Sequence, residues 1–326
     1  MKPKIWHLIG DKRPGGSNHL VRELIASSLG DRHDFLTLRL EEIASLQKSQ
    51  RPDLIIFHYP CAWKYIFSLL KLKKYAPVYI CDHHYCQGFE TQQVKSLWRF
   101  RLMLRICYKI ATGVISVSQA QRRWMVESQL LRPHKVRVIY PASKLANLLT
   151  IPSKIPTSPL ILAAYGRLAR QKGFEQFLEV IQKFSPQKIQ FYLGGYGPEE
   201  EQIKKLSTNL PQVHFLGRVE NVAEFLARCD AVVIPSRWEP FGLVCLEAKA
   251  AGKPVLVSQV DGLVEQVQGC GLVLPLGDQN AWTTAIAALN PETLTQWGQH
   301  GRATVIQAWD NCVQQWECFF REALGE

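Results

Sequence analysis

The stretch of sequence that decides the fold reads Pro235-Ser236-Arg237-Trp238-Glu239-Pro240-Phe241-Gly242-Leu243-Val244-Cys245-Leu246-Glu247-Ala248. It follows an apolar run at Ala231–Ile234, and a turn with Pro and Gly separates that run from a helical pattern. A strand, a sharp turn and a helix N-terminus in this order present free backbone N–H groups to an anion, and the helix macrodipole favours a diphosphate there. Glu239 lies in the turn and Glu247 lies two helical turns further on, so the spacing predicts two carboxylates that line one cleft at different depths.

Outward from this stretch, short apolar runs alternate with amphipathic helical patterns along the whole chain. This alternation predicts an α/β protein with mostly parallel sheets, each half being a doubly wound, Rossmann-like unit. The expected strands are Ile5–Ile9, Leu54–His58, Val78–Cys81, Gly113–Val117 and Val136–Ile139 in the first half, and Leu160–Tyr165, Ile189–Leu193, Val213–Leu216, Ala231–Ile234 and Val255–Val257 in the second.

A proline-rich segment divides the two halves. Pro152, Pro156 and Pro159 exclude a central strand or helix there and indicate a linker. We therefore expect two domains, residues 1–149 and 150–308, which face each other across a cleft. A last helix with a large aromatic face, at about 309–326, could pack on either half, and the first domain is one candidate.

The charge of the chain is concentrated in its first half. Residues 1–150 contain 24 Lys and Arg against 10 Asp and Glu, whereas the remaining residues contain 15 against 18. Such a basic half is expected to meet an anionic partner, and nucleic acid, anionic lipid and phosphorylated glycan all qualify on charge. The absence of a long apolar run, of a signal-peptide core and of Cys-x-x-Cys pairs favours a cytoplasmic protein with reduced cysteines.

The stretch around Glu239 resembles glycosyltransferase family 4, the retaining, group 1 glycosyltransferases of the GT-B fold. Its Glu-x7-Glu motif is matched by Glu239 and Glu247 with Pro-Phe-Gly after the first Glu, and the match continues through 249–255 and 261–265. The resemblance is close over residues 160–270 and loose in the first half. It implies a donor that is a nucleotide diphosphate sugar, and a site in which Glu239 holds sugar hydroxyls, Glu247 holds the ribose, and the helix start at Phe241, Gly242 and Leu243 faces the diphosphate.

Three further segments of the second half extend the resemblance. Gly166–Gly173 carries Arg167 and Lys172 at the positions where the family holds the donor's phosphates, and a guanidinium and an ammonium there would stabilise the leaving group. Gly195 stands in the family's glycine turn where an Asp is usual. Arg218 and Val219 fall in a region that borders the nucleotide base. The alternative for Arg167 and Lys172 is a solvated basic turn, and for Glu239 and Glu247 it is a pair of helix-surface carboxylates.

In the first half, Gly15 and Gly16 are similar to the glycine loop that closes over the donor phosphates, although an ordinary tight turn has the same composition. His83 matches a cleft-facing histidine of the family near the transferring sugar, and strand register favours it over His84. The alternative is a structural histidine. Cys81-Asp82-His83-His84-Tyr85-Cys86 also invites a metal, but adjacent histidines on an extended segment point to opposite faces, so we expect no metal site and no cofactor.

Two basic amphipathic segments, residues 61–74 and 95–109, carry Trp and Leu beside Lys and Arg. Each could lie on an anionic membrane surface, or could bury its apolar stripe in the core, and the two alternatives stay equal here. The family resemblance and the charge together predict transfer of a hexose or N-acetylhexosamine from a UDP-sugar to an anionic saccharide, of the lipopolysaccharide-core type or another lipid-linked glycan. The alternatives are a nucleotide-sugar 2-epimerase of the same fold and a basic nucleic-acid-binding protein, for which the sequence offers no motif, so we expect no nucleic acid as partner.

Overall fold

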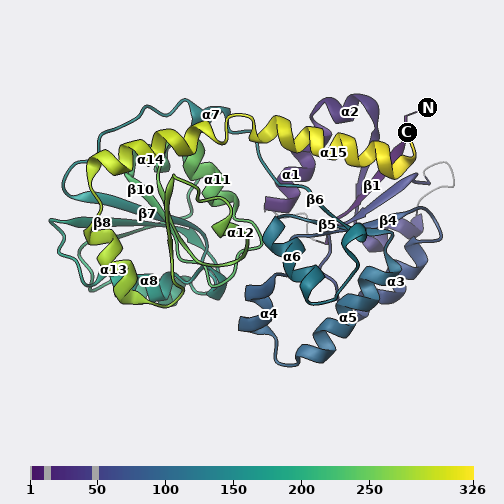
Figure 1. Ribbon diagram of the computed structural model, residues 1–326, viewed down its shortest axis with the longest axis horizontal. Coiled ribbons are helices and arrows are strands. Elements are labelled where there is room, and N and C mark those ends of the chain that lie inside the picture. Colours follow the sequence, from purple (N-terminus) through teal and green to yellow (C-terminus); the bar gives the residue numbers. More distant parts are fainter. Residues whose placement is uncertain (1, 11–15, 46–50) are drawn as a thin grey trace. The chain divides into compact units, whose positions relative to one another are not determined.

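The structure is a computed structural model that describes residues 2–10, 16–45 and 51–326. These residues form two compact units, coloured along the chain in Figure 1. Unit 1 comprises Met1–Lys144 together with Ala308–Glu326, and unit 2 comprises Leu145–Gln307. The division thus falls five residues before the expected boundary, and the proline-rich segment belongs to unit 2, where the Arg302 guanidinium donates to the carbonyl of Ile151 at 2.6 Å.

Unit 1 is built on a six-stranded parallel sheet in the order β2-β1-β3-β4-β5-β6. The inner strands β3 and β5 are buried along their whole length and β4 along most of it, as expected for a parallel sheet with helices on both faces. The strands are β1 Lys4–Leu8, β2 Asp34–Leu38, β3 Leu54–Phe57, β4 Val78–Asp82, β5 Gly113–Ser116 and β6 Val136–Val138. The helices are α1 Gly16–Ile25, α2 Ser28–Arg32, α3 Ile66–Leu72, α4 Gln87–Gln93, α5 Leu97–Ile110, α6 Gln119–Glu127 and α15 Ala308–Leu324, with short 3-10 turns at η1 Leu40–Ser45, η3 Trp63–Tyr65 and η4 Pro133–Lys135.

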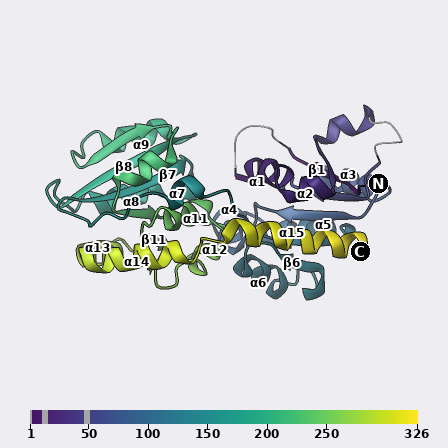
Figure 2. The same cartoon turned by 90° about the horizontal axis from the view of Figure 1, so that it is seen from above.

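The helix α15 completes the core of unit 1 from the far end of the chain. Trp316, Phe319 and Phe320 are fully buried on one of its faces. The ring of Phe319 packs edge-on against Tyr79 of β4, with the ring centroids 4.8 Å apart. Both ribbon views show α15 running alongside the sheet of this unit (Figures 1 and 2).

Unit 2 repeats the same plan with the strand order β12-β11-β10-β7-β8-β9. Its strands are β7 Leu160–Arg167, β8 Ile189–Tyr196, β9 Val213–Gly217, β10 Ala231–Ile234, β11 Val255–Ser258 and β12 Gly271–Leu274. Its helices are α7 Ala146–Leu149, α8 Phe174–Ile181, α9 Glu200–Ser207, α10 Val222–Arg228, α11 Leu243–Ala250, α12 Asp261–Val264, α13 Gln279–Ala287 and α14 Pro291–Ala303, with a 3-10 turn at η5 Arg170–Lys172.

The ten strands expected from the sequence are all present, and two more exist. Both additional strands, β2 and β12, lie at the edge of their sheet and are mostly half-buried. Edge position alone does not set these two strands apart, because β6 and β9 also lie at sheet edges and were expected from the sequence. Within the described residues, no helix is both long enough and apolar enough to span a lipid bilayer.

Candidate active site

The topology of unit 2 gathers the predicted residues at one edge of its sheet. The chain leaves β7 for β8 and β9 on one side, whereas β10, β11 and β12 lie on the other side of β7. Ligands of open α/β sheets bind at the carboxyl ends of the strands where the strand order reverses in this way. The loop after β7 carries Arg167 and Lys172, and the loop after β10 carries Glu239, so the two loops meet at this switch point.

The central contact of the site is an ion pair between the Lys172 ammonium and the Glu239 carboxylate. The two side chains are only 16% and 10% exposed, and the Ser236 hydroxyl donates to the same carboxylate at 3.4 Å. Removing either partner would leave the other charge buried without compensation, which is costly. The sequence predicted both residues as site residues, and the structure brings them into direct contact.

Backbone contacts fix the two loops against each other. The carbonyl of Gln171 accepts from the backbone N–H of Arg237 at 2.7 Å, and the Gln171 side-chain amide donates to the carbonyl of Trp238 at 3.1 Å. Gly173 has a φ of 65°, and a Cβ placed on it would lie 2.3 Å from the carbonyl oxygen of Pro235. Only glycine meets both demands, so the loop ending at Gly173 can approach the loop after β10.

The helix α11 begins directly after this turn, and no side chain caps its N-terminus. Its first turn contains no acidic residue, so the amides and the positive end of the dipole at Leu243 remain available to an anion. Two hydrogen bonds stabilise the turn before α11. Asp261 accepts from the backbone N–H of Glu239 at 3.1 Å, and the Gln266 amide donates to the carbonyl of Phe241 at 2.5 Å.

Glu247 lies on α11 and has a partner that the sequence analysis missed. The hydroxyl of Tyr165, near the end of β7, donates to the Glu247 carboxylate at 2.6 Å. Burial raises the pKa of Glu247, while the bond from Tyr165 and the charge of Lys172 lower it. Burial and the Glu247 charge keep the pKa of Tyr165 well above its ordinary value, so Tyr165 stays a donor. In the sequence, Tyr165 was one more apolar residue of a strand, and only the fold shows that its hydroxyl faces a carboxylate.

The remaining predicted residues of unit 2 surround this edge less closely. Arg167 is exposed at the end of β7, in register with Tyr196 of β8. The guanidinium of Arg218 lies 5.4 Å from the centre of the Tyr196 ring and forms an ion pair with Glu220 at 3.1 Å. Val219 packs its side chain against Gly194. Arg218, Val219 and Tyr196 thus lie at the carboxyl ends of β8 and β9.

Gly195, which stands where an Asp is usual in the family, has no room for a side chain in this structure. Its φ is 152°, and a Cβ at this position would lie 2.0 Å from the carbonyl oxygen of Gly166. Neighbouring β7 and β8 therefore approach each other here too closely for any side chain, including the Asp that is usual in the family.

The predicted residues of unit 1 form a separate group. Gly15 lies outside the described residues, and Gly16 is the first residue of α1. His83 follows β4, and its Nε2 lies 3.0 Å from Nδ1 of His58. His84 turns its Nε2 to the carbonyl of His58 at 3.2 Å. The structure describes which neighbours these histidines have within unit 1, and their role toward a sugar stays a prediction.

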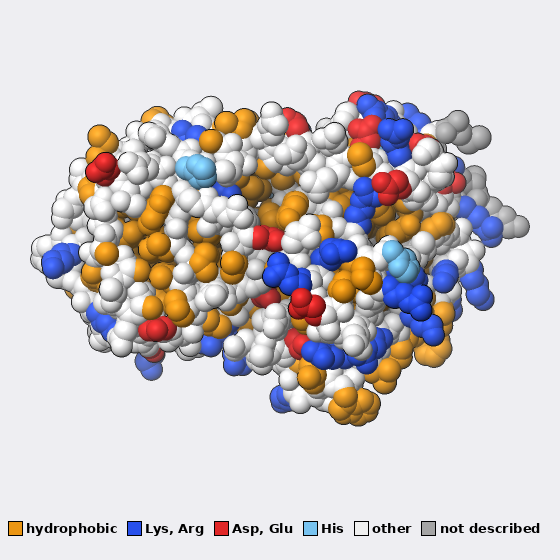
Figure 3. Space-filling view, in the orientation of Figure 1, with side chains coloured by type: hydrophobic (Ala, Val, Ile, Leu, Met, Phe, Trp, Pro, Cys, Tyr) orange, Lys and Arg blue, Asp and Glu red, His pale blue; other side chains and the backbone are white. Residues whose placement is uncertain are grey.

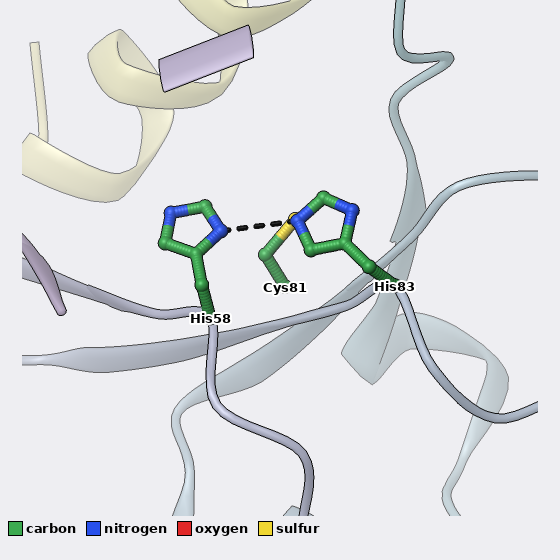
Figure 4. Close-up of side chains that lie close together, drawn as sticks. All are labelled: His58, Cys81 and His83. Atoms are coloured by element: carbon green, nitrogen blue, oxygen red, sulfur yellow. Dashed lines mark hydrogen bonds between the residues drawn. The ribbon is translucent and has the colours of Figure 1, made fainter. Parts of the chain in front are cut away.

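The premise of the metal argument was wrong. Residues 83 and 84 lie in a bend after β4 and not on an extended segment, because the Asp82 carboxylate accepts from the backbone N–H groups of His84 and Tyr85. The bend places His58, Cys81 and His83 with their ligand-type atoms within 4.8 Å of one another (Figure 4). His58 comes from the neighbouring strand end, so the spacing of residues 81–86 gave no sign of it.

Comparison with known families agrees with the class of protein that this fold and edge define. Two parallel six-stranded Rossmann-like sheets in one chain constitute the GT-B fold. Residues 150–304 match the family described as "Glycosyl transferases group 1", and residues 10–145 match "Glycosyltransferase Family 4". The chain belongs to the group 1, family 4 glycosyltransferases.

Curated relatives match part of the chain. The lipopolysaccharide core biosynthesis glycosyltransferase LpsD of Rhizobium meliloti is 32% identical over 142 residues, which is 42% of this chain and 41% of LpsD. The N-acetyl-alpha-D-glucosaminyl L-malate synthase of Bacillus anthracis is 36% identical over 143 residues, 41% of this chain and 38% of that protein. The aligned part thus spans about two fifths of these relatives' own lengths.

Solved structures match over nearly the whole chain. Sucrose-phosphate synthase from Thermosynechococcus elongatus superimposes with a TM-score of 0.83 at 23% identity, covering 100% of both chains. Anabaena Alr3699/HepE in complex with UDP-glucose gives a TM-score of 0.77 at 19% identity, covering 97% of this chain and 99% of that one. At these identities the likeness establishes the fold.

Proposed function

We propose that this protein is a retaining glycosyltransferase that moves a hexose or N-acetylhexosamine from a nucleotide diphosphate sugar, a UDP-sugar by preference, to a saccharide acceptor. Unit 2 binds the donor and unit 1 the acceptor. The observation that carries the proposal is the buried Lys172–Glu239 pair beside the uncapped start of α11. Membership of the family supports the reaction class, and the complex of HepE with UDP-glucose supports the choice of nucleotide.

In the proposed reaction, the bond between the anomeric carbon and the diphosphate oxygen breaks, and a bond to the acceptor hydroxyl oxygen forms on the same face. The acceptor's proton leaves with the nucleoside diphosphate. Negative charge grows on the departing diphosphate, so groups that meet it there lower the barrier. Arg167, Lys172 and the amides at Leu243 supply this stabilisation without a further ion. Glu239 holds hydroxyls of the donor sugar, and Glu247 holds the ribose.

Loss of either of two charged site residues, Glu239 or Arg167, tests the enzyme claim directly. We expect Glu239→Ala and Arg167→Ala each to lower the rate of nucleoside diphosphate release by about 10²-fold or more, as for the loss of one transition-state contact. The readout is coupled detection of the nucleoside diphosphate, and Arg228→Ala, an exposed change on α10, is the matched control. Unchanged turnover in both site variants would refute the proposal, and turnover of donor without acceptor in an NMR time course would indicate the 2-epimerase instead.

The acceptor that we propose is an anionic or lipid-linked glycan of the lipopolysaccharide-core kind, acted on at the inner face of the cytoplasmic membrane. The excess of Lys and Arg in residues 1–150 favours an anionic acceptor. LpsD, whose name assigns it to lipopolysaccharide core biosynthesis, is among the relatives.

One surface of unit 1 supports the membrane location. Seven of the thirteen large hydrophobic side chains that are exposed in the described part of the chain lie between residues 63 and 102. Phe67 and Trp98 are 76% and 69% exposed. We call this region the α3–α5 surface; its apolar members are Trp63, Phe67, Leu70, Tyr75, Leu97, Trp98 and Leu102, and its exposed basic members are Lys64, Lys71, Lys73, Lys74, Lys95, Arg99, Arg105 and Lys109. Figure 3 shows basic and hydrophobic side chains intermingled over α3 and α5.

The helix α5 fits both alternatives that its sequence left open. One face buries Met103, Leu104, Cys107 and Tyr108 in the core, while Leu97, Trp98 and Leu102 of the same helix are exposed. Arg101 does not join the basic surface, because its guanidinium makes a two-pronged pair with Glu90 at 2.8 Å. Exposed Trp and Phe ringed by Lys and Arg are the composition of a surface that enters an anionic lipid interface.

We expect the double variant Phe67→Ser, Trp98→Ser to bind vesicles of phosphatidylglycerol and phosphatidylcholine at least about tenfold more weakly than the wild type, because two aromatic side chains no longer enter the interface. Vesicle co-sedimentation measures this, and salt should weaken the binding of both proteins. Ile155→Ser, at a 72% exposed position of unit 2, is the control and should bind like the wild type. Equal binding by the double variant would contradict the assignment of this surface.

A further inference from the structure

Three histidines of unit 1 form a hydrogen-bonded row that the proposed mechanism does not use. Nδ1 of His7 lies 2.9 Å from Nε2 of His58, and Nδ1 of His58 lies 3.0 Å from Nε2 of His83. The rings are nearly parallel, with centroids 5.2 and 5.3 Å apart. This spacing is close to that of neighbouring strands, because the three residues lie on or directly after the adjacent strands β1, β3 and β4.

The row consists of neutral imidazoles at pH 7. His7 is fully buried and His58 is 5% exposed. Burial lowers the pKa of His7 and of His83 to about 3, and it lowers the pKa of His58 as well. A neutral imidazole has one N–H donor and one acceptor nitrogen. All three rings must therefore carry the proton on the same kind of nitrogen, either Nδ1 or Nε2.

The inner end of the row decides between these two states. Nε2 of His7 and Nε1 of Trp316 are both buried, and neither has a hydrogen-bond partner within the described residues. The two rings are neighbours, with centroids 6.3 Å apart. An indole N–H can only donate, so a bond that satisfies both atoms requires His7 Nε2 to accept. Buried polar atoms without partners are costly, which favours a bond between these two neighbouring rings.

We propose that Trp316, His7 and His58 act as positioning residues that fix His83 in the Nδ1–H tautomer. The Trp316 N–H donates to His7, His7 donates through Nδ1 to His58, and His58 donates through Nδ1 to His83. His83 then presents its own Nδ1–H, a neutral donor, to an acceptor oxygen such as a hydroxyl of the sugar. The identity of that ligand rests on the proposed function, whereas the tautomer rests on the geometry of unit 1 alone.

Cys81 lies behind this row, and the view in Figure 4 shows its sulfur beside the His58–His83 hydrogen bond. Burial raises the pKa of the Cys81 thiol well above its ordinary value, so the thiol stays protonated. The bond between His58 and His83 uses Nδ1 of His58 and Nε2 of His83. Zinc binding to His58, Cys81 and His83 is an outcome that the test below must distinguish.

The tautomers are measured by long-range ¹H–¹⁵N correlation NMR on protein labelled with ¹⁵N-histidine, with His7→Gln, His58→Gln and His83→Gln used for assignment. We expect all three histidines in the neutral Nδ1–H form at pH 7. A His83 signal of the Nε2–H or the charged form would overturn the proposal, and so would stoichiometric Zn²⁺ binding that removes the His58 and His83 signals. This readout requires no substrate, so it stands even if the transferase assignment fails.

Trp316→Phe tests the direction of the row. Without the indole N–H, the Nε2–H form of the histidines should appear, and kcat of the proposed transfer should fall about fivefold with KM for the donor nearly unchanged, which is the loss of about one hydrogen bond. Trp124→Phe is the matched control, since it also removes a buried indole N–H, one that donates to Glu90 at 3.2 Å. Tautomers that stay entirely Nδ1–H in Trp316→Phe would overturn the role of Trp316.

Discussion

Replacing Lys172 by methionine is expected to lower the turnover of the proposed transfer by about 10²–10³-fold, the range measured when one donor to a developing oxyanion is removed. Lys172 forms an ion pair with Glu239, and in the proposed site it is the ammonium that meets the diphosphate of the donor. Methionine keeps the length and the packing of the lysine stem but removes the charge that stabilises the leaving group. The effect should fall on kcat, because that charge is needed most when the diphosphate departs.

The same change also leaves Glu239 without its partner, so a loss of stability must be separated from a loss of catalysis. Thermal unfolding of Lys172→Met and of the double variant Lys172→Met, Glu239→Gln serves this purpose, because the second change removes the uncompensated charge. The double variant should recover stability while remaining inactive. Lys188→Met, an exposed position of the same unit, is the control for activity. Recovery of turnover in the double variant would show that Lys172 serves only the fold.

Replacing Gly195 by alanine is expected to destabilise unit 2 by about 3–5 kcal/mol, the sum of a strained backbone and an overpacked contact. Its Cβ would meet the Gly166 carbonyl oxygen at 2.0 Å, and that oxygen is fixed in the β7–β8 ladder. The family's Asp at this position should be worse still. Urea unfolding followed by circular dichroism measures the change.

Gly217→Ala is the matched control for this prediction. Gly217 also has a positive φ, of 66°, but a Cβ there would meet nothing within 4 Å. Its substitution should cost only the backbone term, about 1–2 kcal/mol. If the two variants lost the same stability, the close approach of β7 and β8 at Gly195 would not be the reason for the glycine.

Much of this architecture could be predicted because central parallel strands are buried on both faces and therefore spell continuous apolar runs. The apolar runs of β3 and β10 were recognised as strands in this way, and Pro240 and Gly242 indicated the turn before α11. The edge strands β2 and β12 were missed for local reasons: Asp34 and Thr37 interrupt the apolar residues of β2, and the short run of β12 begins with Gly271 and is followed directly by Pro275.

The partners of the site residues could not be predicted, since they depend on which strand ends become neighbours. Tyr165 meets Glu247 across 82 positions of the chain, and His7 meets His58 across 51. A local pattern contains no trace of such pairings. What the sequence could show was which residues carry chemistry; how their protons are shared became visible only with the strand order.

The two ends of the chain belong to the same unit, and this affects the order of events during synthesis. The ribosome delivers residues 308–326 only after the whole of unit 2 has been made, so the earlier unit waits for its last helix while the later one can complete its own core first. Until α15 arrives, the surface that receives Trp316 and Phe320 stays bare. During this interval the nascent chain exposes an apolar surface of unit 1, and a chaperone can bind that surface.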